Sequence, residues 1–116
     1  MLTIDALKEY GANVDEGLAR CMGNEALYLK LVNTIPNEKN FDALKRSLDV
    51  HDLEAAFDAA HALKGITGNL ALTPLYEPIV EITELLRTKQ DIDYSDKLAV
   101  ILESRDKLKS ISYNLL

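Results

Sequence analysis

The residues best suited to chemistry lie in one short run, AHALKGITGNL, at positions 60–70. Its periodicity is that of a helix, yet it contains two glycines, each of which costs a helix interior about 1 kcal/mol relative to alanine. On a helix, Gly65 and Gly68 share a face with His61, and Lys64 lies beside them. The run therefore places an imidazole on bare backbone next to one cation, where a bulky partner can reach it.

Imidazole is a competent nucleophile near neutral pH, and it can accept a phosphoryl group on one ring nitrogen and later release it. The group adds about two negative charges and three acceptor oxygens. Lys64 follows His61 by three residues and can offset part of that charge, whereas Asp58, three residues before, would oppose it. The chain has no glycine-rich phosphate loop, so a partner must supply the machinery for transfer.

The composition of the chain is that of a globular domain and argues against several classes of protein. The chain has 116 residues, of which 47% are hydrophobic and 28% charged, as in an ordinary soluble domain. Its net charge of -6 argues against a nucleic-acid partner. Cys21 is the only cysteine, which excludes an intramolecular disulfide and predicts a small buried side chain. We expect a cytoplasmic protein, because the sequence has neither a signal peptide nor an apolar run long enough to span a membrane.

Helical periodicity dominates the first 48 residues. Thr3 and Gly11 predict the ends of a first short helix, and a capping box at Asn13 and Glu16 begins a second one that ends at Gly23. We expect Asn24 to cap a longer helix that Pro36 kinks or interrupts. The apolar positions expected to face inward on either side of this proline are Leu27, Leu31, Ile35, Phe41, Leu44 and Leu48.

The sequence after residue 48 predicts three more helices. Asp52 is the last residue of a turn predicted at residues 49–52 and is the expected N-cap of the next helix. This helix carries His61, one position outside the core seam. Thr73 is the expected N-cap of the next helix, with Pro74 as its first residue and a kink or late start at Pro78. The expected core positions are Leu53, Ala56, Ala60, Leu63, Thr67 and Leu70, then Leu75, Ile79, Ile82 and Leu86, and after a loop at 88–91 Leu98, Ile101, Leu102, Leu108, Ile111 and Leu115.

These elements predict an all-α fold, an antiparallel four-helix bundle with short N-terminal helices covering one end. We expect a single domain over residues 1–116, because the sequence shows neither a linker nor a repeat. Both ends resemble native helix starts and stops, which favours a freestanding protein. One exposed histidine face is enough for function, so we expect a monomer.

The run from Ala60 to Gly65, followed by Gly68-Asn69-Leu70, resembles the signature of histidine-containing phosphotransfer (HPt) domains of multistep two-component relays. The resemblance implies that His61 is the phosphoacceptor, Lys64 the cation that neutralises phosphate, and Gly65 and Gly68 the clearance for a docking partner. The partners would be response-regulator receiver domains, with that of a hybrid histidine kinase as one candidate.

The resemblance also limits what the chain does by itself. Receiver domains would supply the phosphoaspartate and the magnesium, so the chain would be a phosphocarrier without a cofactor or metal of its own rather than an enzyme. Two positions depart from the family pattern, since Ala71 stands where members often have glycine and Pro78 where they often have a helix former. Both departures concern the geometry of the helix after the histidine.

Three alternatives remain open from the residues alone. Gly65 and Gly68 would also let another helix pack closely. Asp58 and His61 have the spacing of half a di-metal carboxylate motif, although such sites need two motifs and the second histidine, His51, falls in a turn. The third alternative is a helical interaction module in which His61 is never phosphorylated.

Overall fold

The computed structural model describes residues 2–112, and the regular structure of this part is entirely helical. Leu115, which the sequence places on the last helix, lies outside the described residues. The elements in chain order are α1 (Ile4–Tyr10), α2 (Val14–Arg20), α3 (Glu25–Thr34), the 3-10 turn η1 (Ile35–Asn37), α4 (Lys39–Asp49), α5 (Leu53–Asn69), α6 (Thr73–Arg87) and α7 (Ser95–Ser112).

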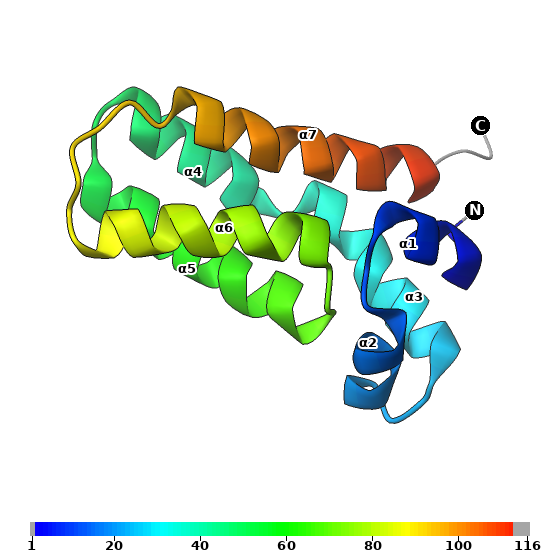
Figure 1. The fold of residues 1–116 in the computed structure, drawn as a ribbon. Coiled ribbons are helices and arrows are strands. Elements are labelled where there is room, and N and C mark those ends of the chain that lie inside the picture. The colour runs from blue at the N-terminus through cyan, green and yellow to red at the C-terminus, as the bar shows by residue number, and fades with distance from the viewer. Residues whose placement is uncertain (1, 113–116) are drawn as a thin grey trace.

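Helices α4 to α7 form the predicted antiparallel bundle, in which each helix runs against the one before it (Figure 1). The α5 helix packs closely against both α4 and α6, while α7 packs against α6 and against the turn η1. The apolar seam predicted along α5 is buried from Ala56 to Leu70, and so are the four predicted core residues of α6. The all-α bundle expected from the sequence is therefore confirmed.

The first three helices cover the end of the bundle where α5 turns into α6 (Figure 1). Two hydrogen bonds hold them on this turn: the Asn13 N–H donates to the Ala71 carbonyl at 2.9 Å, and the Tyr28 hydroxyl donates to the Leu70 carbonyl at 2.9 Å. Burial, with a smaller contribution from Cys21, raises the pKa of Tyr28 to about 12, so the hydroxyl keeps its proton at neutral pH. The expected cover at one end of the bundle is confirmed.

Local capping signals were reliable guides to where helices begin. The side chains of Thr3, Asn13, Asn24 and Asp52 each accept a hydrogen bond from the backbone N–H three residues later, as the sequence predicts. The first helix ends at Tyr10, and the predicted stop Gly11 is its C-cap, with φ 108°. The second ends at Arg20 rather than Gly23, because a turn through residues 21–23 follows it. Pro36 lies in η1 and interrupts the α3–α4 segment as expected.

The inward face of α3 was predicted wrongly. Leu27 and Leu31 are each 38% exposed, whereas Tyr28 and Val32, one position further along, are fully buried. Both pairs have the same four-residue spacing, so periodicity alone does not choose between them. The choice follows from Gly17 on α2, whose missing side chain leaves the space that the Tyr28 ring fills.

The start of α6 also differs from the prediction. Leu72 is the N-cap, without a side-chain cap bond, and Thr73 is the first helical residue. Leu72 takes this position because it is buried and its carbonyl accepts the first helical bond, from the Tyr76 N–H at 2.8 Å. The helix passes through Pro78 uninterrupted instead of starting after it, and Ala71 adopts φ 55°, a left-handed conformation that glycine reaches more easily. The two departures from the family pattern thus leave α6 formed.

The contact between Gly17 and Tyr28 gives a test of how the N-terminal cover is attached. A Cβ at position 17 would lie 2.5 Å from the Tyr28 ring, which is fully buried and anchored to Leu70. We expect Gly17→Ala to lower the free energy of unfolding by about 1–3 kcal/mol, despite its higher helix propensity. Urea denaturation measures this change, and a variant as stable as the parent would contradict the packing described here.

Candidate functional site

His61 lies at the middle of α5, just outside its buried seam. The preceding residue, Ala60, is completely buried, whereas His61 is exposed. Its ring stacks on Phe57, one turn earlier, with the centroids 5.6 Å apart and the planes inclined by 20°. The guanidinium of Arg87 on α6 lies over the same Phe57 ring, 5.1 Å from its centroid. The imidazole is therefore accessible to a partner and rests on an aromatic support.

Lys64 lies one turn after His61 and is already paired. Its ammonium is 3.8 Å from a carboxylate oxygen of Glu84 on α6, and Glu84 also pairs with Arg87 at 3.2 Å. The Glu84 side chain is about half exposed. Ion pairs at such exposure contribute little to stability, so a stronger anion can displace Glu84 at small cost.

The two glycines on this face differ in what lies above them. At Gly65 an added Cβ would meet nothing within 4 Å, so the backbone there is open to a partner. At Gly68 the added Cβ would lie 2.8 Å from the ring of Tyr76 on α6. The alternative of close helix packing is confirmed for Gly68, whose bare backbone is covered by Tyr76 of the same chain. Contact between Gly68 and a docking partner stays a prediction.

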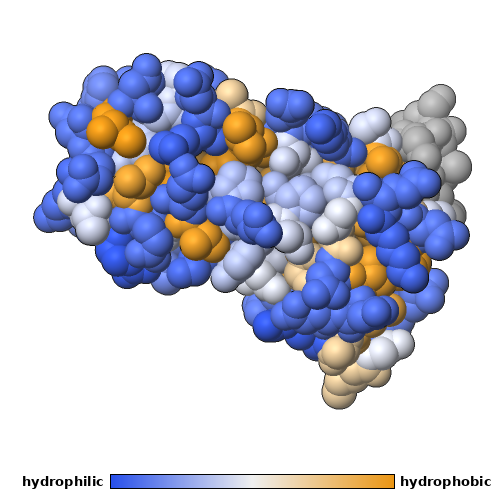
Figure 2. Space-filling view, viewed as in Figure 1, coloured by the Kyte–Doolittle hydropathy of each residue, from blue (hydrophilic) through white to orange (hydrophobic). Residues whose placement is uncertain are grey.

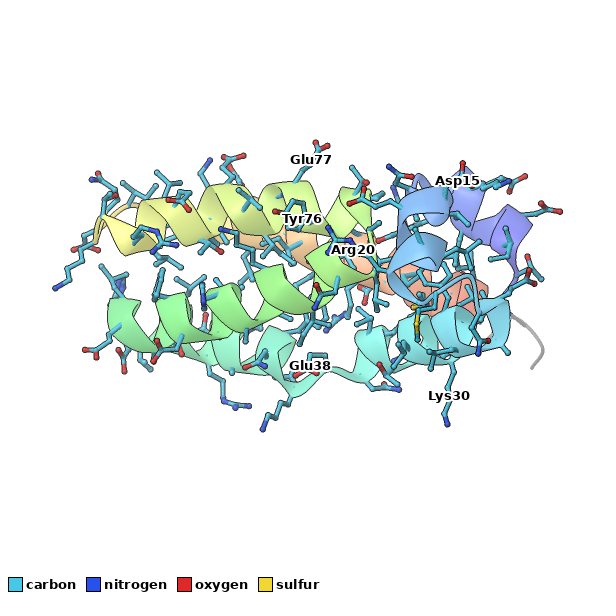
Figure 3. The ribbon with its side chains drawn as sticks, turned by 90° about the horizontal axis from the view of Figure 1, so that it is seen from below. Asp15, Arg20, Lys30, Glu38, Tyr76 and Glu77 are labelled. Atoms are coloured by element: carbon cyan, nitrogen blue, oxygen red, sulfur yellow. The ribbon has the colours of Figure 1, made fainter. Side chains whose placement is uncertain are left out.

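His61 opens onto a groove of about 360 Å³ at the junction of α2, α5 and α6, here called the His61 groove. Figure 3 shows Arg20 and Tyr76 close together at this junction. Its lining includes His61, Lys64, Gly65, Gly68 and Asn69 on α5, Tyr76 on α6, and Glu16 and Arg20 on α2.

Arg20, Glu16 and Tyr76 were missed in the sequence, because nothing local marks them as neighbours of His61. Within the groove Arg20 pairs with Glu16 at 3.1 Å, and its other terminal nitrogen donates to the Asn69 side chain at 3.5 Å. Glu16 and Arg20 reach the groove because α2 packs beside it in the folded chain. The groove thus holds a second cation that the histidine motif does not contain.

The remaining sequence candidates lie elsewhere. His51 is exposed in the turn before α5, where its Nδ1 is 4.0 Å from a carboxylate oxygen of Asp91. Within residues 2–112, no group of three or more His, Cys, Asp or Glu side chains is placed to hold a metal ion. The di-metal interpretation of Asp58 and His61 therefore has no geometric support in this part of the chain.

The surface is mainly hydrophilic on the face that Figure 2 shows. Hydrophilic residues cover most of the face seen in Figure 2, and hydrophobic residues appear there in small separate groups. Among the helices of the described part, none combines the length and the apolar character needed to cross a membrane. Cys21 is buried and free, as predicted.

The fold and the site define a helical bundle that displays one histidine beside a cation. Comparison with protein-family models matches the Hpt domain over residues 37–111, which is more than half of the chain. The chain belongs to the Hpt domain family. Comparisons with curated proteins and with solved structures gave no significant match.

Membership confirms the resemblance drawn from the histidine motif. Hpt domains are phosphotransfer modules of two-component systems and serve as phosphocarriers rather than enzymes. The matched region contains α4, α5, α6 and all but the last residue of α7, and with them His61, Lys64, Gly65 and Gly68. It begins at residue 37, so α1, α2 and α3 lie outside the matched region.

The difference between the two glycines can be measured. We expect Gly65→Ala to raise the free energy of unfolding by about 1 kcal/mol, because the new methyl group meets no neighbour and the helix propensity improves. Gly68→Ala should gain less, because the Tyr76 ring must move. Combining it with Tyr76→Ala should remove that conflict between the two side chains, which a double-mutant cycle by urea denaturation detects. Equal gains at positions 65 and 68, with no coupling to Tyr76, would contradict the assigned packing.

Proposed function

We propose that this chain is a phosphorelay intermediate in which His61 accepts a phosphoryl group from the phosphoaspartate of one receiver domain and passes it to another. The observation that supports it is the position of His61, exposed at the middle of α5 inside the region matched by the Hpt family. Lys64 and the open backbone at Gly65 lie on the same side of the helix.

The transfer needs no general base on this chain, because no proton has to be removed from the attacking nitrogen. The ring nitrogen of His61 that carries no proton attacks phosphorus, so an N–P bond forms while the P–O bond of the phosphoaspartate breaks. The aspartate leaves as a carboxylate, and the proton on the other ring nitrogen stays in place. Transfer to the second receiver domain is the reverse reaction on another aspartate.

Lys64 neutralises the phosphoryl group by changing partners. In the resting protein its ammonium pairs with Glu84 across a gap of 3.8 Å. A phosphoryl group with about two negative charges on His61, one turn away, attracts the ammonium more strongly than one carboxylate does. The gain in charge stabilisation therefore arises only when the phosphoryl group is present.

Gly65 provides the clearance that lets a receiver domain approach His61. A side chain at this position would project into open space beside the imidazole, where the partner must come within bonding distance. The partner would supply the phosphoaspartate and a bound magnesium ion that neutralises charge during transfer. One such face serves both transfers in turn, so we propose a monomer whose partners include the receiver domain of a hybrid histidine kinase.

The test of this function offers the protein a receiver domain that carries labelled phosphoaspartate. We expect the chain to acquire an acid-labile label, and His61→Gln to acquire none while keeping the far-UV circular dichroism and stability of the parent. His51→Gln is the matched control and should be labelled normally. Label that persists in His61→Gln would overturn the assignment of the acceptor.

The role of Lys64 predicts opposite effects for the two members of its ion pair. Lys64→Gln should lower the rate of phosphoryl transfer to the chain about threefold to tenfold, since it removes a partly exposed charge-assisted hydrogen bond to the phosphoryl group. Glu84→Gln releases Lys64 and should keep or raise the rate. Single-turnover transfer at several receiver concentrations measures both, and equal losses in the two variants would contradict the exchange of partners.

A further inference from the structure

We infer that Arg20 is a second phosphate-binding cation of the His61 groove, supplied by α2 from outside the matched region of the Hpt family. The inference rests on the proposed phosphorylation of His61 and deepens it. Among the described residues that line the groove, Arg20 and Lys64 are the cations, and they reach it from different helices. The phosphoryl group would thus meet positive charge from two sides.

The backbone of α2 is fixed firmly enough to position a side chain. The loop before it is tied to the α5–α6 turn, because the Asn13 N–H donates to the Ala71 carbonyl at 2.9 Å. Gly17, at the middle of α2, packs directly on the buried Tyr28 ring. Arg20 is the last residue of this helix, so its side chain leaves a held backbone at the rim of the groove.

The present partners of Arg20 are easily exchanged. Its ion pair with Glu16 joins residues four apart on one helix, and both side chains are about half exposed. Pairs of this kind contribute little to stability. The hydrogen bond to Asn69 is long, at 3.5 Å. A phosphoryl group offers the guanidinium two parallel charge-assisted bonds instead, which is the geometry that arginine prefers.

The gap between Arg20 and His61 runs along the groove. Asn69 follows His61 by eight residues on α5, which is about 12 Å along the helix axis. Arg20 already reaches Asn69, and Lys64 and Gly65 occupy the interval between Asn69 and His61. Since Gly65 carries no side chain, the path along the groove from Asn69 towards His61 is open at that residue. A phosphoryl group on the imidazole and an extended arginine can therefore approach each other within the groove.

Glu16 competes with the phosphoryl group for Arg20. Its carboxylate also lines the groove, so a phosphoryl group on His61 raises the negative charge beside it. Glu16 and the phosphoryl group both attract the guanidinium, and the phosphoryl group, which carries more charge, competes with Glu16 for it. In the resting protein the Glu16 carboxylate neutralises the charge of Arg20.

The experiment measures the equilibrium constant for phosphoryl transfer between a labelled receiver domain and the full chain. For Arg20→Gln we expect this constant to shift away from the phosphohistidine about threefold to tenfold, with unchanged urea denaturation of the unphosphorylated protein. Arg20→Lys should recover part of the loss, because it restores the charge without the planar fork. Glu16→Gln should shift the equilibrium towards the phosphohistidine. The ³¹P resonance of the phosphohistidine should move in Arg20→Gln and provides a readout that stability alone does not affect.

Two results would overturn the inference. One is an Arg20→Gln protein with the equilibrium constant and ³¹P resonance of the parent, and the other is an equal loss in Arg20→Lys and Arg20→Gln. His61→Gln separates this failure from failure of the proposed function: if it cannot be labelled while Arg20→Gln behaves as the parent, the relay function stands and only the role of Arg20 is wrong. Label retained by His61→Gln would instead refute the relay function itself.

Discussion

One-sided burial of α5 is the constraint on which the rest of the site depends. The helix packs against α4 and α6, and its small and apolar residues, from Ala56 to Thr67, fill the space between them. Only the remaining edge can carry chemistry, and His61 occupies it with Phe57 one turn before and Lys64 one turn after. Since the buried stripe fixes the rotation of α5 in the bundle, it also fixes the direction in which the imidazole faces.

A second constraint acts at the turn between α5 and α6. The carbonyls of Leu70 and Ala71 accept hydrogen bonds from Tyr28 and from the loop before α2, so this turn carries the N-terminal cover as well as joining two bundle helices. Ala71 holds its carbonyl in place with a left-handed backbone at φ 55°. Through this turn, a segment that lies outside the matched Hpt region comes to border the His61 groove.

Sequence reasoning succeeded where the determining interaction is local. Caps at Asn13 and Asp52 and the seam of α5 depend on residues three or four apart, and the structure has them as predicted. It failed where the determining contact is distant: the inward face of α3 depends on Gly17, and the cover over Gly68 is Tyr76 from the next helix. Arg20 belongs to the same group, because its position at the groove follows from the docking of α2.

The charges around His61 would let an acidic protein hold the proposed phosphoryl group. Each cation of the groove is neutralised at rest by a carboxylate, Lys64 by Glu84 and Arg20 by Glu16. These pairs are exposed and weak, so the empty site carries no large positive field that would bind stray anions. In the proposed relay, a phosphoryl group attached covalently to His61 would compete at close range, with more charge than either carboxylate. The site would then change its ion pairs in response to phosphorylation and would need no change of fold to do so.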